Sequence, residues 1–135
     1  MSKEKVEIVR NIYESGMMDR DPEELLQLAT DDIEYVNSPN AVEPGVRRGI
    51  VAVAEAMRRF AEPWVESRHE LRELHDRGDA VVAAVSWYTR SRESSRELVQ
   101  KKVHTWTLDK GRLTRFEWGL DLGEALEAAG PSEDR

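Results

Sequence analysis

The order of the hydrophobic patterns predicts an α+β protein. Three segments in the first half repeat apolar residues at helical spacing, and four strand-like segments joined by short turns follow them. Helices followed by a run of antiparallel strands are typical of an α+β fold and not of a parallel α/β sheet. At 135 residues, the chain is expected to form a single domain, 1–135, that buries about two-thirds of its unfolded surface without a metal or a disulfide.

Two helices are predicted near the N-terminus. From Lys3 to about Gly16 the apolar residues recur one helical turn apart, and a glycine suits the left-handed end of a helix. Asp21 and Pro22 begin a short second helix, because aspartate is a favoured N-cap and proline fits the first helical position. Asp31-Asp32 is then expected to turn the chain into a strand over 33–36.

A loop over 37–45 and a link over 46–49 lead into a longer amphipathic helix. Its apolar face carries Ile50, Val53, Ala54, Met57, Phe60 and Trp64. Pro63 is expected to kink or end this helix. Four strands are predicted after it, over 69–75, 80–88, 98–108 and 113–120, and then a helix over 123–129. The polar tail, 130–135, is expected to be disordered.

Charge and composition exclude several kinds of partner and site. A net charge of −7 with scattered basic residues argues against a nucleic acid or an anionic membrane. The chain has no cysteine, and its three histidines are His69, His75 and His104. His69 and His75 are predicted to lie on one strand face, too far apart to bind one metal, so we expect no metal and no cofactor. No apolar run approaches the roughly 18 residues of a membrane span, and the N-terminus does not begin a signal peptide, which indicates a cytoplasmic protein.

Several short motifs follow one another in a characteristic order. They are Asn37-Ser38-Pro39, Glu43-Pro44-Gly45 and Arg48-Gly49, and later His104-Thr105-Trp106, Gly111-Arg112-Leu113, Arg115-Phe116-Glu117-Trp118, Asp121 and Ala129-Gly130. In this order they resemble the SnoaL-like branch of the nuclear-transport-factor-2-like (NTF2-like) superfamily, over about residues 6–130. The resemblance implies a cystatin-like cone, in which a curved antiparallel or mixed β-sheet wraps around N-terminal helices and leaves a cavity for a hydrophobic small molecule.

The last hairpin is expected to carry part of this cavity. Asp109-Lys110-Gly111 matches a three-residue loop, which would place His104 opposite Phe116 and Trp106 opposite Thr114. A two-residue loop would instead bring His104 opposite Glu117, a second candidate acid. On the favoured three-residue register the residues that share one face are His104, Trp106, Phe116 and Trp118. This face suits a flat apolar ligand, although its aromatic residues would equally form a core or a dimer interface.

The resemblance also implies catalytic roles. In SnoaL-like cyclases an aspartate near the last strand removes a proton from a polyketide carbon, and the matching residue is Asp121, with His104 as its hydrogen-bond partner or acid. Asp121 would equally suit the N-cap of the final helix. Tyr13, Tyr35 and Trp64, with Phe60, are expected to line the cavity. A phenol there can donate to an oxyanion, as in ketosteroid-isomerase-like members, or it can simply belong to the core.

Three functions fit these observations. The first is a cofactor-independent isomerase, cyclase, dehydratase or epoxide hydrolase that uses a carboxylate base on a hydrophobic small molecule. The second is a non-catalytic ligand-binding module with the same pocket. The third is an interaction module that forms a homodimer through its exposed sheet face. Because Ala80 to Val85 does not alternate, that face is expected to be covered by a partner, through Val82, Ala84, Val99 and Val103.

Overall fold

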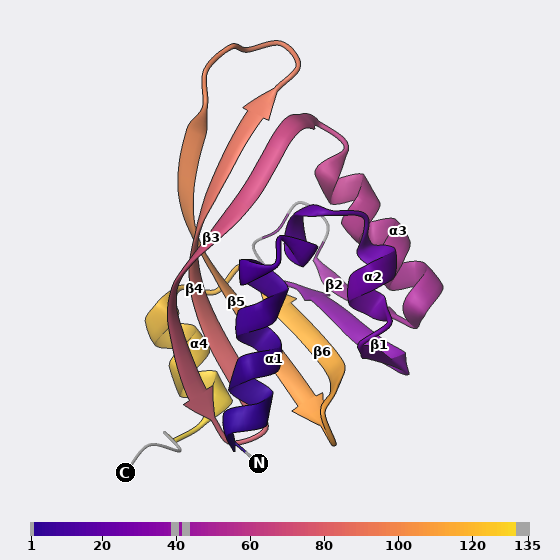
Figure 1. Cartoon of the computed structure of the whole chain (residues 1–135), viewed down its shortest axis with the longest axis vertical. Coiled ribbons are helices and arrows are strands. Elements are labelled where there is room, and N and C mark those ends of the chain that lie inside the picture. Colours follow the sequence, from indigo (N-terminus) through magenta and orange to yellow (C-terminus); the bar gives the residue numbers. More distant parts are fainter. Residues whose placement is uncertain (1, 39–40, 42–43, 132–135) are drawn as a thin grey trace.

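The computed structural model describes residues 2–38, 41 and 44–131, and it confirms the α+β fold (Figure 1). Its helices are α1 (Ser2–Glu14), the short 3-10 helix η1 (Met17–Asp19), α2 (Pro22–Leu26), α3 (Ile50–Ala61) and α4 (Leu122–Ala129). Its strands are β1 (Ala29–Asn37), β2 (Gly45–Arg48), β3 (Trp64–Arg77), β4 (Ala80–Ser91), β5 (Leu98–Asp109) and β6 (Arg112–Trp118). Of the polar tail, residues 132–135 lie outside the described residues.

The strands form one mixed sheet in the order β2-β1-β6-β5-β4-β3. Strands β3 to β6 are an antiparallel meander, as expected, whereas β1 pairs in parallel with β6. This parallel pairing places Tyr35 beside Phe116. The first and last strands are therefore neighbours, and residues far apart in the sequence meet on one side of the sheet.

Helices cover the two faces of the sheet unequally. On the inner face, α1 packs on β3 and β4, and α3 packs on β1 and β2 (Figure 1). Helix α4 packs on the outer face, against β3, β4 and β5. The largest fully buried side chains include Val9, Ile12, Val53, Val81, Val85 and Trp106. The hydrophobic core therefore lies between α1, α3 and the inner face.

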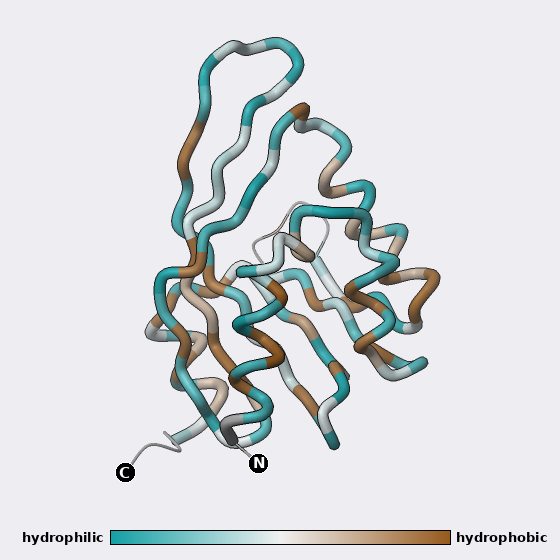
Figure 2. The backbone as a smooth tube through the Cα atoms, in the orientation of Figure 1, coloured by the Kyte–Doolittle hydropathy of each residue, from teal (hydrophilic) through white to brown (hydrophobic). Residues whose placement is uncertain are grey.

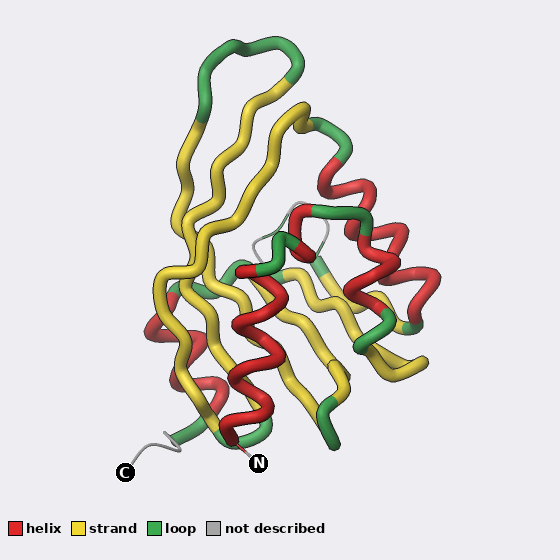
Figure 3. Tube along the Cα trace, in the orientation of Figure 1, coloured by secondary structure: helices red, strands yellow, loops and turns green. Residues whose placement is uncertain are grey.

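Strands β3, β4 and β5 extend beyond the helices, and a loop over 92–97 joins β4 to β5 at the tip (Figure 3). The loop is hydrophilic, whereas apolar residues gather lower in the sheet and on the helices that face it (Figure 2). The inner face of this extension is only partly covered by helix, so part of the sheet is free to form the wall of a cavity.

Several expected boundaries were wrong. Trp64 begins β3 instead of ending α3, because the helix stops at Ala61, just before Pro63. Most of the link 46–49 belongs to strand β2, which begins at Gly45, pairs with β1 and places Val46 opposite Val36. Strand β1 begins at Ala29, and Asp31-Asp32 lies inside it at an irregularity in the pairing with β6.

Gly119 explains why β6 ends at Trp118 rather than continuing to residue 120. Its φ is +102°, in the left-handed region that favours glycine, and a Cβ built on it would lie 2.4 Å from the Cβ of Ser38. A side chain has no room at this position. The chain therefore leaves the sheet here, in close contact with the end of β1.

Both expected registers of the last hairpin were wrong. Asp109 pairs with Arg112, so the loop has two residues, Lys110 (φ 51°) and Gly111 (φ 80°), as in a type I′ turn. A bulge three residues into the hairpin then inserts Thr114 as an extra residue in β6.

Because of this bulge, His104 lies opposite Trp118 and Trp106 lies opposite Phe116. The face that these four residues were expected to share is nevertheless confirmed, since residues that pair directly across two strands point to the same side.

A second bulge, between Leu71 and Glu73 in β3, separates His69 from His75. The extra residue turns His75 to the outer face, so the expectation that both histidines share one face was wrong.

Part of the outer face, which was expected to be covered by a partner chain, is covered by helix α4 of the same chain. Val82 is fully buried within the single chain, where α4 packs on β4, whereas Val99 is 56% exposed.

Candidate functional site

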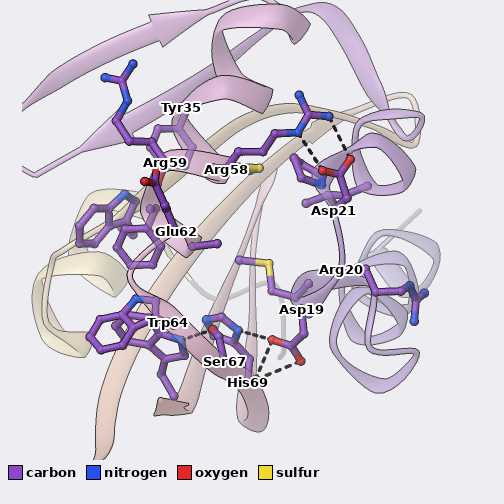
Figure 4. A pocket seen from close by; sticks show the side chains of 18 of the residues that line it. Asp19, Arg20, Asp21, Tyr35, Arg58, Arg59, Glu62, Trp64, Ser67 and His69 are labelled. Carbon is purple, nitrogen blue, oxygen red and sulfur yellow. Dashed lines mark hydrogen bonds and ion pairs between the residues drawn. The ribbon is translucent and has the colours of Figure 1, made fainter. Parts of the chain in front are cut away.

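A cavity of about 740 Å³ lies between the inner face of the sheet and the segment from η1 to α3 (Figure 4). Its aromatic lining consists of Tyr35, Phe60, Trp64, Trp87, Phe116 and Trp118. The cavity also contains two histidines, His69 and His104. A cavity of this size and lining suits a drug-sized ligand with flat apolar surfaces.

Trp87 is at the centre of the aromatic wall. Phe60 stacks on it with ring centroids 5.0 Å apart and an interplanar angle of 22°, and Trp64 meets it edge-on at 5.4 Å. The indole Nε1 donates to Ser67 Oγ at 2.9 Å, which orients the ring. Trp87 was not among the site residues expected from the sequence, although its spacing from Val81 and Val85 places all three on one strand face.

His104 is held from behind by Tyr13 and Trp106. Trp106 Nε1 donates to the Tyr13 hydroxyl at 2.8 Å, and this hydroxyl lies 2.7 Å from His104 Nδ1. Because the phenol oxygen already accepts from the indole, its own proton is best placed on the bond to Nδ1. His104 then carries its proton on Nε2. The three side chains are at most 5% exposed, so this chain of hydrogen bonds is dry.

Burial holds His104 in the neutral form. It lowers the pKa of His104 well below the ordinary 6.5, and the nearby His69 and Lys102 lower it further. Burial also raises the pKa of Tyr13 far above its ordinary value, so the phenol keeps its proton. At neutral pH, His104 can therefore donate a hydrogen bond from Nε2 without carrying a charge.

The ring of His69 is held by Asp19. Its Nδ1 lies 2.7 Å from Asp19 Oδ1, and its backbone N–H donates to the two carboxylate oxygens at 2.9 and 3.1 Å (Figure 4). A carboxylate only accepts, so Nδ1 carries a proton, and in the neutral tautomer of the ring Nε2 has the lone pair. The His69 side chain is 8% exposed and that of Asp19 is 19% exposed.

The two imidazoles lie close together. The ring centroids of His69 and His104 are 5.5 Å apart, and the ring of His69 stacks on Trp87 at 5.9 Å. One ring offers a basic nitrogen and the other an N–H donor, which is the combination required to take a proton from one atom and stabilise charge on another. Asp19 was missed by the sequence analysis, since it lies 50 residues from His69 and no local pattern links them.

The expected site residues fall into three groups. His104, Tyr35, Phe60, Trp64, Phe116 and Trp118 line the cavity. Tyr13 and Trp106 lie behind the cavity wall, where they support His104. Asp121 lies outside the cavity wall and caps α4: Glu124 N–H donates to Asp121 Oδ1 at 2.8 Å, and Asp121 N–H donates to Glu124 Oε1 at 3.1 Å.

Glu117, the second candidate acid, also lies away from the cavity. It lines a small hollow of about 240 Å³ on the outer face, beneath α4. No carboxylate of the last hairpin or of α4 therefore reaches His104 among the described residues.

Ion pairs surround the mouth of the cavity. Arg58 donates to both carboxylate oxygens of Asp21 at 2.8 and 2.9 Å, which links α3 to the start of α2 (Figure 4). The hydrogen bond from Arg58 lowers the pKa of Asp21 to about 2. Glu55 pairs with Arg59 on α3 at 3.0 Å.

The described part of the chain shows neither a candidate metal site nor a candidate membrane-spanning helix. No three His, Asp or Glu side chains there converge in the way that a metal site requires. No helix there is both long and apolar enough to cross a membrane.

Comparison with known proteins identifies the family of this chain. Residues 9–116 match the family described as a SnoaL-like domain. No curated protein is significantly similar to the chain in sequence.

Solved structures resemble most of the chain. TerC, crystallised with polyporic acid, is 25% identical with a TM-score of 0.73, covering 93% of this chain and 98% of its own. A candidate SnoaL-like polyketide cyclase from Jannaschia sp. CCS1 is 16% identical with a TM-score of 0.75, covering 96% of this chain and 94% of its own.

A third similar structure comes from Catenulispora acidiphila DSM 44928. It has a ketosteroid-isomerase-like fold and was solved in complex with trimethylamine. It is 15% identical with a TM-score of 0.71, covering 93% of this chain and 94% of its own.

Proposed function

The chain belongs to the SnoaL-like family of the NTF2-like superfamily, and from this premise we propose that it is a cofactor-independent enzyme acting on a flat, hydrophobic carbonyl compound. The proposed reaction begins with removal of a proton from the carbon next to the carbonyl group, as in isomerases, cyclases and dehydratases. The observation that supports it is the pair of imidazoles in one aromatic cavity, one with a free lone pair and one with a free N–H.

His69 is the proposed base. Its Nε2 takes the proton as the C–H bond breaks, and the electron pair moves into the carbonyl to form an enolate. The imidazolium that results has its Nδ1–H on the Asp19 carboxylate, which stabilises the new positive charge. This pair replaces Asp121 as the proposed base, because Asp121 caps α4 outside the cavity.

His104 is the proposed donor to the enolate oxygen. A neutral imidazole with a proton on Nε2 can donate a hydrogen bond to the negative enolate oxygen and so stabilise it. Tyr13 holds the ring in this tautomer through the 2.7 Å bond to Nδ1. Return of the proton from His69 to a different carbon completes an isomerisation, and attack of the enolate on a second carbonyl completes a cyclisation.

Two relatives support a small molecule as the ligand. TerC was crystallised with polyporic acid and the Catenulispora protein with trimethylamine, and we extend only the size class of these ligands to this chain. The aromatic wall around Trp87 favours the larger and flatter of these two shapes.

Solvent exchange tests the proposal without knowledge of the natural substrate. The protein is incubated in D₂O with 2-tetralone and related cyclic aryl ketones, and the loss of the C–H signal beside the carbonyl is followed by NMR. We expect the wild type to accelerate exchange, and His69→Gln to remove about two to four orders of magnitude of that acceleration. Asp19→Asn should also slow it, and His75→Gln, on the outer face, serves as the matched control.

The same measurement separates the enzyme from a binding module of the same fold. A wild type that binds the ketones but gives only background exchange would favour non-catalytic ligand binding. Exchange that survives His69→Gln would refute the role of His69.

A homodimer through the outer sheet face remains a separate proposal. Its support is the outward position of Val99, 56% exposed, on a strand that helix α4 covers only in part. Light scattering should report twice the chain mass of 15.5 kDa, and Val99→Glu should halve the measured mass. Val51→Glu, at an 82% exposed position on α3, is the control, and a wild-type monomer would end the proposal.

A further inference from the structure

The lining of the cavity is more basic than the protein as a whole. Five basic and four acidic side chains line it, although the whole chain carries a net charge of −7. Three of the acids are already paired: Asp19 with His69, Asp21 with Arg58, and Glu55 with Arg59. The attraction of a ligand to the cavity therefore depends on the side-chain charges that have no ion-pair partner, more than on the net charge of the lining.

Lys102 is the available cation nearest to the imidazoles. It lies on β5 two residues before His104, so both side chains point to the inner face. It is partly buried and lines the cavity, and its Nζ lies 5.7 Å from the centroid of the Trp87 ring. Among the described residues, no acidic side chain lies within ion-pair distance of Nζ.

The surroundings of Lys102 do not neutralise its charge. A partly buried ammonium loses part of its hydration, and a cation–π contact with one indole face replaces only some of it. The available acid, Glu62, is exposed at the end of α3 and does not reach Lys102. Lys102 instead has a cavity in front of it, an aromatic ring beside it and the proposed donor His104 two residues away.

We propose that the ligand of this cavity is an organic anion, with an aromatic or otherwise flat body, whose negative oxygens bind Lys102 Nζ while the body packs on Trp87. This inference rests on the proposed function and adds the substrate class: a carbonyl compound that also carries a carboxylate or an ionised enol. Arg92, on the loop side of the same cavity, is a second cation that an elongated anion can reach.

Lys102 also affects the neighbouring imidazole of His104. After burial and His69, its charge is a further cause that lowers the pKa of His104 in the ligand-free protein. An anion bound at Lys102 Nζ would offset that charge beside the proposed donor.

Two fluorescent probes that differ by one sulfonate test the proposal. The probes are 8-anilinonaphthalene-1-sulfonate, an anion, and N-phenyl-1-naphthylamine, its uncharged counterpart. Their dissociation constants are measured by fluorescence titration at low ionic strength, and displacement of one by the other shows that they share a site. We expect the wild type to bind the anion about fivefold or more tightly than the neutral probe, despite the negative charge of the protein.

Lys102→Met is the decisive variant, because it keeps most of the apolar stem and removes the charge. It should weaken binding of the anionic probe about tenfold and change binding of the neutral probe by less than about twofold. Lys102→Arg should retain the preference for the anion. Lys101→Met removes the same charge from the adjacent, exposed position on the outer face and should leave both constants within about twofold of the wild type.

The outcomes distinguish this inference from the proposed function. Equal weakening of both probes by Lys102→Met, or an equal effect of Lys101→Met, would refute the anion site and leave the apolar cavity intact. Binding of the anion that the neutral probe does not displace would also refute it. If neither probe binds the wild type, the proposed ligand-binding cavity and the anion site both fail.

Discussion

Replacement of Tyr13 by phenylalanine tests the hydrogen bonds that hold His104. The change removes one oxygen and leaves the ring in place. That oxygen joins two buried groups, as acceptor for Trp106 Nε1 at 2.8 Å and as partner of His104 Nδ1 at 2.7 Å. Trp106 is fully buried and His104 is 5% exposed, so water cannot readily replace the lost partner.

The expected loss of stability follows from these two contacts. A buried polar group left without a partner costs about 1–3 kcal/mol. The indole N–H loses its acceptor and His104 Nδ1 loses its donor. A shift of the His104 proton to Nδ1 would not restore a partner for that nitrogen. We therefore expect Tyr13→Phe to lower the free energy of unfolding by about 2–4 kcal/mol.

Urea denaturation followed by circular dichroism measures this difference. Tyr88→Phe is the control: its hydroxyl accepts from Arg72 at 3.3 Å on the outer face, and its loss should cost less than about 0.5 kcal/mol. Nitrogen NMR of the histidine rings provides a second readout, in which His104 should lose its fixed Nε2–H tautomer in Tyr13→Phe alone. A Tyr13→Phe protein as stable as the wild type, with the tautomer unchanged, would refute the proposed arrangement.

Two further predictions concern pH and backbone conformation. Burial lowers the pKa of His104 below 6.5, so below pH 6.5 the unfolded chain binds a proton that the folded chain excludes. The free energy of unfolding of the wild type should therefore fall as the pH falls. The fall should exceed that of His104→Gln by up to about 1.4 kcal/mol per pH unit. The groups that face this ring, His69, Tyr13 and Lys102, stay the same in both proteins, and parallel pH profiles would contradict the assignment. Gly119→Ala should destabilise the protein by about 2 kcal/mol more than Gly45→Ala in thermal melts. Both positions have positive φ, but only at Gly119 would the new Cβ lie 2.4 Å from another atom, the Cβ of Ser38. Equal effects would show that Ser38 moves aside at little cost.

Local sequence signals predicted most elements of the fold correctly. The Asp21-Pro22 start of α2, the four strands of the meander and the helix at the C-terminus are all governed by residues close in sequence. The family resemblance was correct for the same reason, because it depended on the order of these local elements. Strand β2 escaped prediction because four residues with two arginines show no clear alternation, and only the pairing with β1 makes them a strand.

The site was harder to predict than the fold because it depends on register and on long-range contacts. Two bulges, in β3 and β6, each shift the side chains by one residue, and neither bulge has a glycine or proline to mark it. One bulge moved His75 away from His69, and the other moved Trp118 opposite His104. The pairing of His69 with Asp19 required knowledge of how η1 sits on β3, which no periodicity in one strand or helix reveals.

The hydrogen-bonded polar groups of the site come from two parts of the chain that are far apart in sequence. Tyr13 and Asp19 come from the first 19 residues, whereas the histidines that they hold belong to strands β3 and β5. Detachment of this segment would release both imidazoles from their tautomers, and it would also uncover the core that α1 covers on β3 and β4. Exchange of the same segment between homologous chains would alter the acid–base character of the site without any change to the strands. Loss of the residues before a protease cut near residue 20 is therefore expected to release both histidines and to destabilise the protein at the same time.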